Sequence, residues 1–425
     1  MKYLFIQKVT STSFKVLAIL LMLTSSCDIF ESSSSQKNTE IEEEGWSEPE
    51  ILFTLRVQNS VDDSLSQAFN MLQATVQQET IHLVTNNVRR INHRILDFSE
   101  ILFLQKEEGG TTEIRQITKR DLPSEQPTIL RDHEGNLHLL WGDRRLDPNF
   151  EQWESTSMSQ TANFSTNVVY TRYDGTGFEP PVSIYEGNLS LLGRGDIQFP
   201  LQLVEAADHR LHTVFKADSL VRTTNTMGDS VTAFDRRFVY MNRPPAGVWS
   251  EPRFLFIDYE GFPEGHSLTG TNPVIAAPSA NRLVVAFLSS VGGVNDVLAI
   301  TSDDGGRTWS EAQLVFSSGR QASFFLKMRQ APGGRLHLVW AKLVDDVLPE
   351  EMWHSYSEDA GNNWSQPERF FTLRKPTFIP TGSPEPPETI ISSYDIVVDE
   401  NNRVHWAGIE VVFVDSLHNK IHYTS

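Results

Sequence analysis

Arginines and aromatic residues gather in the longest segments of the chain that show no repeated pattern. These residues are Arg89, Arg90, Arg94, Arg144, Arg145, Phe150, Trp153, Phe262 and Phe378. Guanidinium groups pair with anions and aromatic rings offer a large apolar face, so together they indicate a site for an anionic or glycan-like ligand. A solvated rim without a ligand is the alternative. No zinc-ligand spacing, P-loop or nucleophile elbow is present, and we expect neither a metal nor a cofactor.

Five histidines are also candidates for catalysis or metal binding, but they occupy equivalent positions of a sequence repeat. Each lies in a short run of alternating bulky residues that follows a turn, which is typical of a strand. The five are His82, His138, His212, His337 and His405. A catalytic or metal-binding histidine would not recur in this way. We interpret these residues as strand histidines that hydrogen-bond between neighbouring repeats.

Two eight-residue segments match the pattern S-x-D-x-G-x-x-W at every fixed position. The matching residues are Ser302, Asp304, Gly306 and Trp309 in the first segment and Ser357, Asp359, Gly361 and Trp364 in the second. In such a turn the Asp side chain accepts backbone hydrogen bonds and Gly supplies a positive φ. We expect the Trp to bury its ring against the same repeat. These residues shape a turn and are not catalytic.

Four degenerate copies bring the turns to six, roughly 55 to 70 residues apart. Each copy belongs to a unit of four apolar strands, and four strands repeated radially are typical of a propeller. The sequence therefore predicts an all-β, six-bladed β-propeller of four-stranded antiparallel blades. The last unit lacks a fourth strand, and the segment 48–55 is a strand without a preceding third. We expect this N-terminal strand to pair with residues 420–424 and close the last blade.

The turn pattern, placed between third and fourth strands, resembles the Asp box (BNR repeat) of the sialidase (neuraminidase) superfamily over about residues 46–425. Members of that family use an arginine triad, an Asp general acid and a Tyr–Glu nucleophile. A glycosidase needs an acid and a nucleophile or base, and the resemblance implies Asp143 and Tyr394 for these roles. The alternatives are that Tyr394 packs at the start of a strand and that Asp143 and Arg144 form an ion pair at the rim. The substrate-binding residues that it implies are Arg144, Arg145, Arg194, Arg320, Glu264 and His266.

One departure from the family bears on function. The segment Glu125-Gln126-Pro127 keeps the Pro of the family's R-I-P motif and lacks its Arg. Bidentate pairing of Arg with a carboxylate is hard to replace, which disfavours sialic acid as the ligand. Two functions stay open: a propeller that binds and hydrolyses a glycan as an exo-glycosidase, and a non-catalytic propeller that binds a protein or polysaccharide partner. Convergence of Asp143, Tyr394 and two arginines on one pocket would favour the hydrolase.

The N-terminus is typical of an exported bacterial lipoprotein. Three lysines and the apolar run 16–23, which is too short to span a bilayer, precede the only cysteine, Cys27. We predict a signal peptide over 1–26, a lipidated Cys27 with a flexible Ser-rich and acidic tether over 27–44, and the propeller over 45–425. An ordinary cleaved signal peptide is the alternative. We expect a monomer held in the cell envelope, at the outer membrane, by its lipid anchor alone.

The charge of the chain excludes one class of partner. Its 425 residues carry a formal net charge of −19 at pH 7. Such a charge opposes binding to nucleic acid through the phosphate backbone. We therefore expect no nucleic-acid partner.

Overall fold

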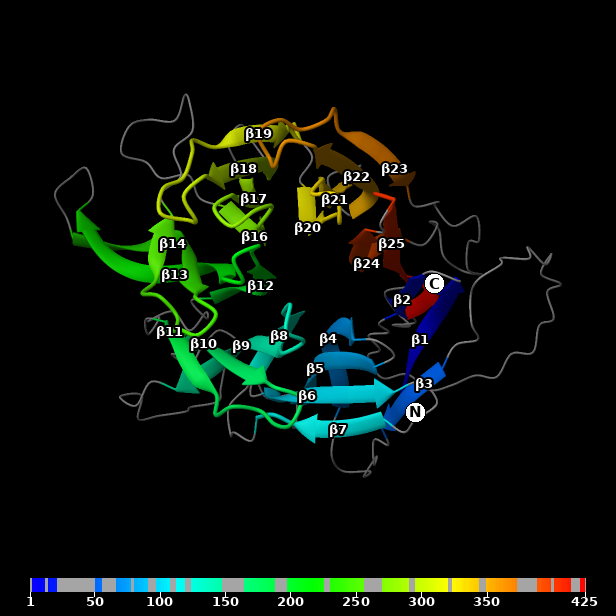
Figure 1. Cartoon of the computed structure of the whole chain (residues 1–425). Helices are drawn as coiled ribbons and strands as arrows, with labels where there is room; N and C mark the ends of the chain where they lie inside the picture. The colour runs from blue at the N-terminus through cyan, green and yellow to red at the C-terminus, as the bar shows by residue number, and fades with distance from the viewer. Residues whose placement is uncertain are drawn as a thin grey trace.

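The computed structural model of the chain consists of strands and turns (Figure 1). It describes residues 2–11, 14–20, 50–55, 66–77, 80–90, 97–107, 112–118, 124–146, 164–187, 197–224, 230–255, 270–289, 295–319, 323–343, 349–372, 388–398, 401–413 and 421–424. No helix is found within these ranges, and hence none there that is long and apolar enough to cross a membrane.

Five antiparallel sheets in the described chain each contain four strands that follow one another in sequence. They are β4 (Ser66–Gln77), β5 (Thr80–Arg90), β6 (Asp97–Glu107) and β7 (Thr112–Gln116); β8 (Ser124–Arg131), β9 (Leu137–Leu146), β10 (Phe164–Tyr173) and β11 (Val182–Glu186); β12 (Ile197–Glu205), β13 (Leu211–Thr224), β14 (Ser230–Arg243) and β15 (Arg253–Leu255); β16 (Gly270–Ala276), β17 (Leu283–Ser289), β18 (Asp296–Ser302) and β19 (Gln313–Phe316); and β20 (Ser323–Gln330), β21 (Leu336–Leu343), β22 (Pro349–Ser357) and β23 (Glu368–Thr372).

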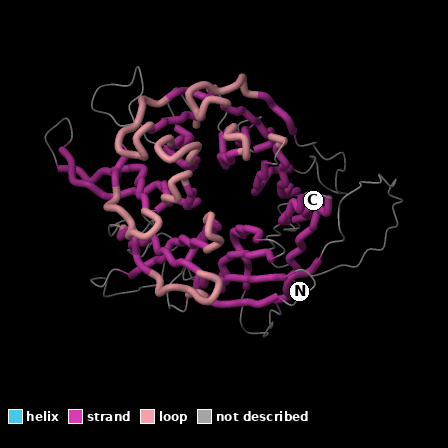
Figure 2. Tube along the Cα trace, viewed as in Figure 1, coloured by secondary structure: helices cyan, strands magenta, loops and turns pink. Residues whose placement is uncertain are grey.

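The sheets form a ring around a central opening, and the first strand of each sheet lies innermost (Figure 1). Contacts join these innermost strands in chain order, from β4 through β8, β12, β16 and β20 to β24 (Glu388–Val398). Figure 2 shows the strands of each sheet following one another outward from this opening to the rim, with turns between them. Such a radial order is propeller-like. The prediction of an all-β fold built from four-stranded antiparallel sheets is confirmed.

Two further sheets have three strands each. One contains β24, β25 (Val404–Phe413) and β26 (Ile421–Thr424), and the other contains β1 (Lys2–Ser11), β2 (Phe14–Leu20) and β3 (Glu50–Leu55) in the order β2-β1-β3. β3 pairs with β1 and β26 pairs with β25, so the predicted pairing of residues 48–55 with 420–424 is not found among the described strands. The reason is that β1 and β2, rich in Val, Ile, Leu and Phe, form a hairpin whose open edge takes β3.

The hydrophobic core lies between consecutive sheets. Each of five buried clusters joins one sheet to the next around the ring. Along β17 the clusters alternate: Leu283 and Phe287 pack with the β12–β15 sheet, whereas Val284 and Leu288 pack with the β20–β23 sheet. Successive side chains of a strand point to opposite faces, and here both faces are buried. This explains why such strands have an almost unbroken apolar sequence.

The two S-x-D-x-G-x-x-W turns contain the predicted hydrogen bonds. Ser302 Oγ donates to Asp304 Oδ1 over 2.9 Å, and the backbone N–H of Thr308 donates to the same oxygen over 2.9 Å. Ser357 Oγ and Asp359 Oδ1 repeat the first bond at 2.9 Å. Hydrogen bonds from the hydroxyl and backbone amide of Thr308 hold the pKa of Asp304 well below its usual value. The charged carboxylate is therefore part of the turn.

The aromatic residue of the turn packs against the preceding sheet as well as its own, and the contact with the preceding sheet was not predicted. Three ring pairs share a steep edge-to-face geometry: Phe178 with Phe103 (5.1 Å, 82°), Trp249 with Tyr170 (5.4 Å, 75°) and Trp309 with Tyr240 (5.5 Å, 75°). In each pair the second residue lies on the third strand of the preceding sheet. Edge-to-face contact of two rings is favourable, and the neighbouring sheet provides it here.

Two of the repeated histidines, His138 and His212, hydrogen-bond within their own sheet, whereas bonds between repeats were predicted. His138 Nδ1 lies 2.7 Å from the hydroxyl of Tyr170, and His212 Nδ1 lies 2.7 Å from the hydroxyl of Tyr240. Each tyrosine belongs to the adjacent antiparallel strand, two positions from the residue directly opposite the histidine. Diagonal neighbours on one face of a sheet are within reach of long side chains, which explains the pairing.

Candidate functional site

A cavity of about 480 Å³ lies on the axis of the ring, where six innermost strands meet. Its lining comes from the C-terminal halves of these strands: Thr75 of β4, residues 128–131 of β8, 202–205 of β12, 275–277 at the end of β16, 327–330 of β20 and Asp395 of β24. The volume is in the usual range of small-ligand pockets. The sequence predicted a ligand among the long connections, several of which enter at the opposite, N-terminal ends of these strands. This cavity was not foreseen.

Irregularities in the innermost strands position the lining segments. Gln126 in β8, Asn272 in β16 and Phe325 in β20 have φ values of 50°, 50° and 55°, and the strand register shifts at each of them. Pro127 and Pro273 follow two of them, which suits an unpaired position because proline has no N–H to donate. A bulge changes the direction of the side chains after it, and the cavity lining begins within three residues of each bulge.

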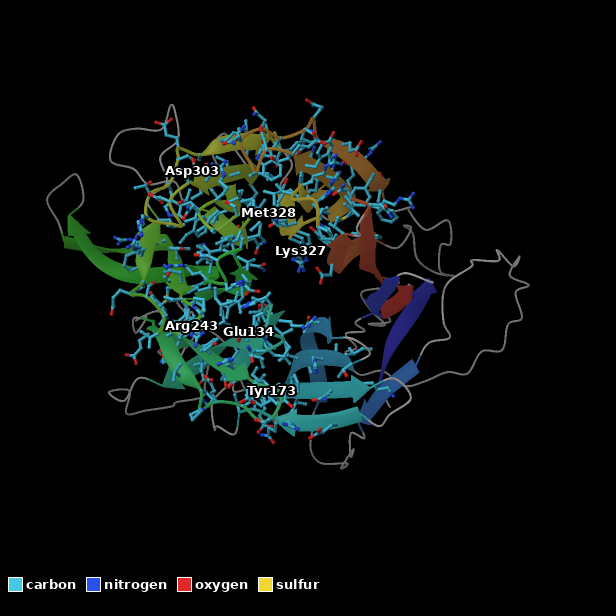
Figure 3. The ribbon with its side chains drawn as sticks, in the orientation of Figure 1. Glu134, Tyr173, Arg243, Asp303, Lys327 and Met328 are labelled. Carbon is cyan, nitrogen blue, oxygen red and sulfur yellow. The ribbon has the colours of Figure 1, made fainter. Side chains whose placement is uncertain are left out.

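Five charged side chains line the cavity: the cations Arg131, Lys327 and Arg329 and the acids Glu205 and Asp395. Arg329 Nη2 donates to Asp395 Oδ1 over 2.9 Å. For Arg131 and Lys327, the described part of the chain contains no hydrogen-bonded acceptor. Figure 3 shows Lys327 beside the central opening. An excess of positive charge therefore lies on the axis of a protein whose net charge is −19.

Burial sets the protonation chemistry of this cluster. It lowers the pKa of Lys327, the charge of Arg329 adds to the lowering, and the carboxylate of Asp395 opposes it. Burial also raises the pKa of Asp395, but Arg329 and Lys327 outweigh this effect and hold that pKa below its usual value. A cation that loses its hydration is stabilised by an anion placed next to it. The cluster is therefore suited to binding an anionic group.

Asp143, the predicted general acid, lies at the far end of β9 from this cavity lining. It is 1% exposed, and Ser124 Oγ donates to its Oδ1 over 2.7 Å. Its backbone lies opposite Ser124 on one side and Asn167 on the other. Asp143 is not among the residues that line the cavity. In this structure it acts as a buried acceptor between adjacent strands.

Tyr394, the predicted nucleophile, is 5% exposed and lies between β24 and the β20–β23 sheet. Its hydroxyl lies beside the carbonyl oxygens of Phe325 and Val339, the latter at 2.9 Å. Burial raises its pKa well above 10, and carbonyl oxygens around a phenol oppose a phenolate further. Both effects run against nucleophilic character. The geometry supports packing between sheets and does not support the predicted role.

For the other predicted site residues, the structure describes the backbone alone, or the residue lies outside the described part of the chain. Arg144 and Arg145 continue β9 opposite Thr166 and Ser165, but only their backbone is described. Those that lie outside the described residues are Arg194, Arg320, Glu264, His266 and Cys27. Of the predicted pair, neither Asp143 nor Tyr394 lines the cavity, and so the convergence that would have favoured a hydrolase is not found there.

Sequence reasoning missed Arg131, Lys327, Arg329 and Asp395. A signal was present, because Lys327 and Arg329 are two positions apart in a strand and so share one face. Two cations on one face of an innermost strand are hard to accommodate in an apolar core, and both line the cavity. The acidic partner could not have been inferred, because Asp395 comes from a different sheet, 66 residues away along the chain.

Comparison with known proteins assigns no family to the chain. No family model matches it, and no curated protein matches it. Among solved structures, a Dyadobacter fermentans protein of unknown function is 13% identical over 83% of this chain and 96% of its own, with a TM-score of 0.48. A Penicillium chrysogenum alpha-L-arabinanase complexed with arabinobiose is 11% identical over 71% and 80%, with a TM-score of 0.38. The NanB sialidase from Streptococcus pneumoniae is 13% identical over 88% and 63%, with a TM-score of 0.34. With scores below 0.5, these similarities assign no role to any residue.

Proposed function

We propose that this protein is a sialidase-like propeller that binds an acidic glycan on the axis of its ring. The observation that carries the proposal is the pair Arg131 and Lys327, two cations without a hydrogen-bonded acceptor among the described residues, in a cavity of about 480 Å³. Carboxylate and sulfate groups of acidic glycans are the anions that such cations pair with.

The rest of the lining suits a sugar more than a small inorganic anion. Gln202 and Gln330 carry amide groups that can donate to and accept from sugar hydroxyls. Ile129, Ile275 and Met328 also belong to the lining, and their side chains are largely buried between the sheets. A few polar groups placed among apolar side chains are characteristic of small-molecule pockets. The proposal is therefore a glycan with at least one acidic residue.

Binding to glycans of different charge tests this proposal. Isothermal titration with oligogalacturonate and sialyllactose, and with maltohexaose and cellohexaose as neutral glycans, should give saturable binding for at least one acidic glycan only. Arg131→Gln and Lys327→Gln should each weaken that binding by about tenfold or more, since a charged hydrogen bond contributes roughly 1.5–3 kcal/mol. Arg335→Gln is the matched control, because Arg335 pairs with Glu358 on the surface and does not line the cavity. Equal binding of neutral glycans would refute the proposal.

We propose that the protein binds the glycan and that Asp143 and Tyr394 do not hydrolyse it. A fluorogenic glycoside panel should show no turnover that depends on these residues. Turnover in the wild-type chain that is lost in Tyr394→Phe and Asp143→Asn, with both variants folded, would instead restore the exo-glycosidase assignment.

We propose that the chain is exported and anchored in the outer membrane through a lipid on Cys27, with residues 28–44 as the tether. The support is the sequence pattern around the single cysteine. Metabolic labelling with a fatty-acid analogue tests it. We expect the label in the wild-type chain and its loss in Cys27→Ser, whereas unlabelled wild-type protein would exclude the anchor.

We also propose that the propeller has six units, of which β24–β26 is the last. Its fourth strand would be β3 in a chain that has lost residues 1–26, because β1, the strand that pairs with β3, belongs to the predicted signal peptide.

A further inference from the structure

Two histidines and a glutamate from neighbouring sheets meet at the end of the ring where the innermost strands finish. His133 lies in the β8–β9 turn, Glu205 is the last residue of β12, and His209 lies in the β12–β13 turn. Glu205 Oε1 is 2.5 Å from His133 Nδ1 and 3.2 Å from His209 Nδ1. One potential ligand atom from each of the three side chains lies within 4.8 Å of the others.

We propose that His133, Glu205 and His209 bind a divalent transition-metal ion of the zinc, nickel and copper class. Two imidazole nitrogens and one carboxylate oxygen form a donor set that these ions favour, whereas Mg²⁺ and Ca²⁺ favour oxygen ligands alone. Three protein ligands leave at least one coordination position for water or a ligand.

The carboxylate is already oriented for this role. The backbone N–H of His133 donates to Glu205 Oε2 over 2.9 Å, which leaves Oε1 directed at the two imidazoles. Outer hydrogen bonds of this kind fix the direction of a ligand and tune its affinity for a metal. Glu134, labelled in Figure 3, is the next residue in the turn and adds negative charge. Its Oε1 lies 4.0 Å from His133 Nε2.

The imidazole rings can open to admit the ion. They are stacked with centroids 3.3 Å apart and planes 18° apart, closer than most aromatic pairs. A metal lies near the plane of each imidazole that binds it, so the rings must rotate apart and the 2.5 Å contact must lengthen. The side chains of His133 and His209 are 39% and 45% exposed, which leaves both free of core packing. Glu205, at 15%, is the more fixed member.

Metal binding at this place would add a coordination link between two sheets that meet through an apolar cluster and the hydrogen bonds of His133 to Glu205. The β8–β9 turn and the β12–β13 turn belong to neighbouring sheets, and Glu205 also lines the axial cavity. The ion would therefore connect the interface between these sheets to the rim of the cavity. This proposal does not depend on glycan binding.

The test is titration of the untagged full chain with Zn²⁺ after treatment with a chelator. We expect one equivalent of Zn²⁺ to bind at neutral pH and to raise the unfolding temperature. His133→Gln and His209→Gln should each weaken binding by more than about 100-fold, because even outer-shell changes typically cost 10- to 100-fold. Asp208→Asn is the matched control: it removes a carboxylate next to His209 that is not one of the three ligands.

A second measurement does not depend on substitution. Zn²⁺ should protect His133 and His209 from modification by diethyl pyrocarbonate, measured by peptide mass spectrometry. Ca²⁺ and Mg²⁺ should neither protect them nor compete with Zn²⁺. The proposal is overturned if the wild-type chain does not bind Zn²⁺, if both histidine variants bind it as the wild type does, or if Zn²⁺ leaves both histidines open to modification.

Discussion

The hydroxyl of Tyr240 donates to the carbonyl oxygen of Gly305 over 3.0 Å, so the third strand of one sheet is bonded to the S-x-D-x-G-x-x-W turn of the next. The next residue of the turn, Gly306, has a φ of +86°, and a Cβ added to it would overlap the Tyr240 ring. The glycine of the turn therefore serves two purposes. It permits the backbone conformation, and it lets a neighbouring sheet approach.

Gly306→Ala should lower the free energy of unfolding by about 2–5 kcal/mol. A positive φ costs an alanine about 1–2 kcal/mol, and overpacking against Tyr240 adds about 1–3 kcal/mol. The measurement is urea unfolding. Gly334→Ala is the matched control, because Gly334 has a φ of +88° and nothing within 4 Å of the added Cβ. Its loss should be limited to the backbone cost. Equal losses in the two variants would show that the approach of Tyr240 is unimportant.

Arg282→Lys should destabilise the protein by about 1–3 kcal/mol even though the charge is kept. The guanidinium donates to three acceptors in two turns: Ala360 O (2.8 Å), Asp303 Oδ1 (2.7 Å) and Asn362 Oδ1 (2.6 Å). A lysine ammonium cannot reproduce this planar arrangement, so at least one of the three acceptors would lose its hydrogen bond.

Thermal and urea unfolding measure the effect of this change. Arg335→Lys is the control, because Arg335 makes a surface ion pair with Glu358, a contact of the kind that contributes less than about 1 kcal/mol. A loss in Arg282→Lys no larger than in the control would contradict the proposed link between turns.

Stability should fall as the pH is lowered from about 7 to about 4, before most carboxylates titrate. Burial lowers the pKa of His82, His212 and His337 from 6.5 to about 4. Between these values the unfolded chain binds protons that the folded chain does not, so protonation favours unfolding. The contribution of these neutral histidines to stability is fully present above pH 6.5 and is lost as the pH falls to about 4. At about 1.4 kcal/mol for each pH unit, the loss is on the order of 3 kcal/mol per histidine.

His212→Gln isolates one of these contributions. Whatever it does to the total stability, it should reduce the slope of unfolding free energy against pH between 6.5 and 4. A simple packing defect would shift the curve without changing this slope. An unchanged slope in His212→Gln would mean that His212 titrates alike in the folded and unfolded chains.

In a chain that already lacks residues 1–26, the further removal of β3 should lower the stability. In the full chain β3 pairs with β1, but a chain that begins at residue 27 has no β1, and β3 is then free to complete the β24–β26 sheet. A chain that begins at residue 57 lacks β3 and leaves that sheet edge unpaired. We expect the chain from 27 to unfold at higher urea concentration than the chain from 57. Equal midpoints would contradict closure by β3.

Much of the arrangement of four-stranded sheets could be predicted because its determinants are local. The turn residues Ser302, Asp304 and Gly306 bond within a few positions of one another, and the unbroken apolar run of β17 reflects burial on both faces. Consecutive strands joined by short turns then pair with their neighbours. The partner of Trp309 could not be predicted in the same way, because Tyr240 lies in the preceding sheet.

The candidate site was predicted less well, and the reason is again distance along the chain. A family resemblance implied catalytic roles for Asp143 and Tyr394. In this structure both residues are buried, Asp143 accepts a hydrogen bond from Ser124, and Tyr394 donates to backbone carbonyl oxygens. Arg329 and Asp395, the ion pair of the cavity, are 66 residues apart and meet only when two sheets pack.

The sequence by itself determined the strands, the turns and their repetition along the chain, since hydrogen bonds within a turn and apolar runs within a strand need no distant partner. Tertiary structure alone decided which residues share a site. It brought Arg131 and Lys327 to one axis, set Glu205 between His133 and His209, and paired β3 with β1. Each of these outcomes depends on how whole sheets pack against one another. Sheet packing is governed by shape and burial across the interface, which no short stretch of residues encodes.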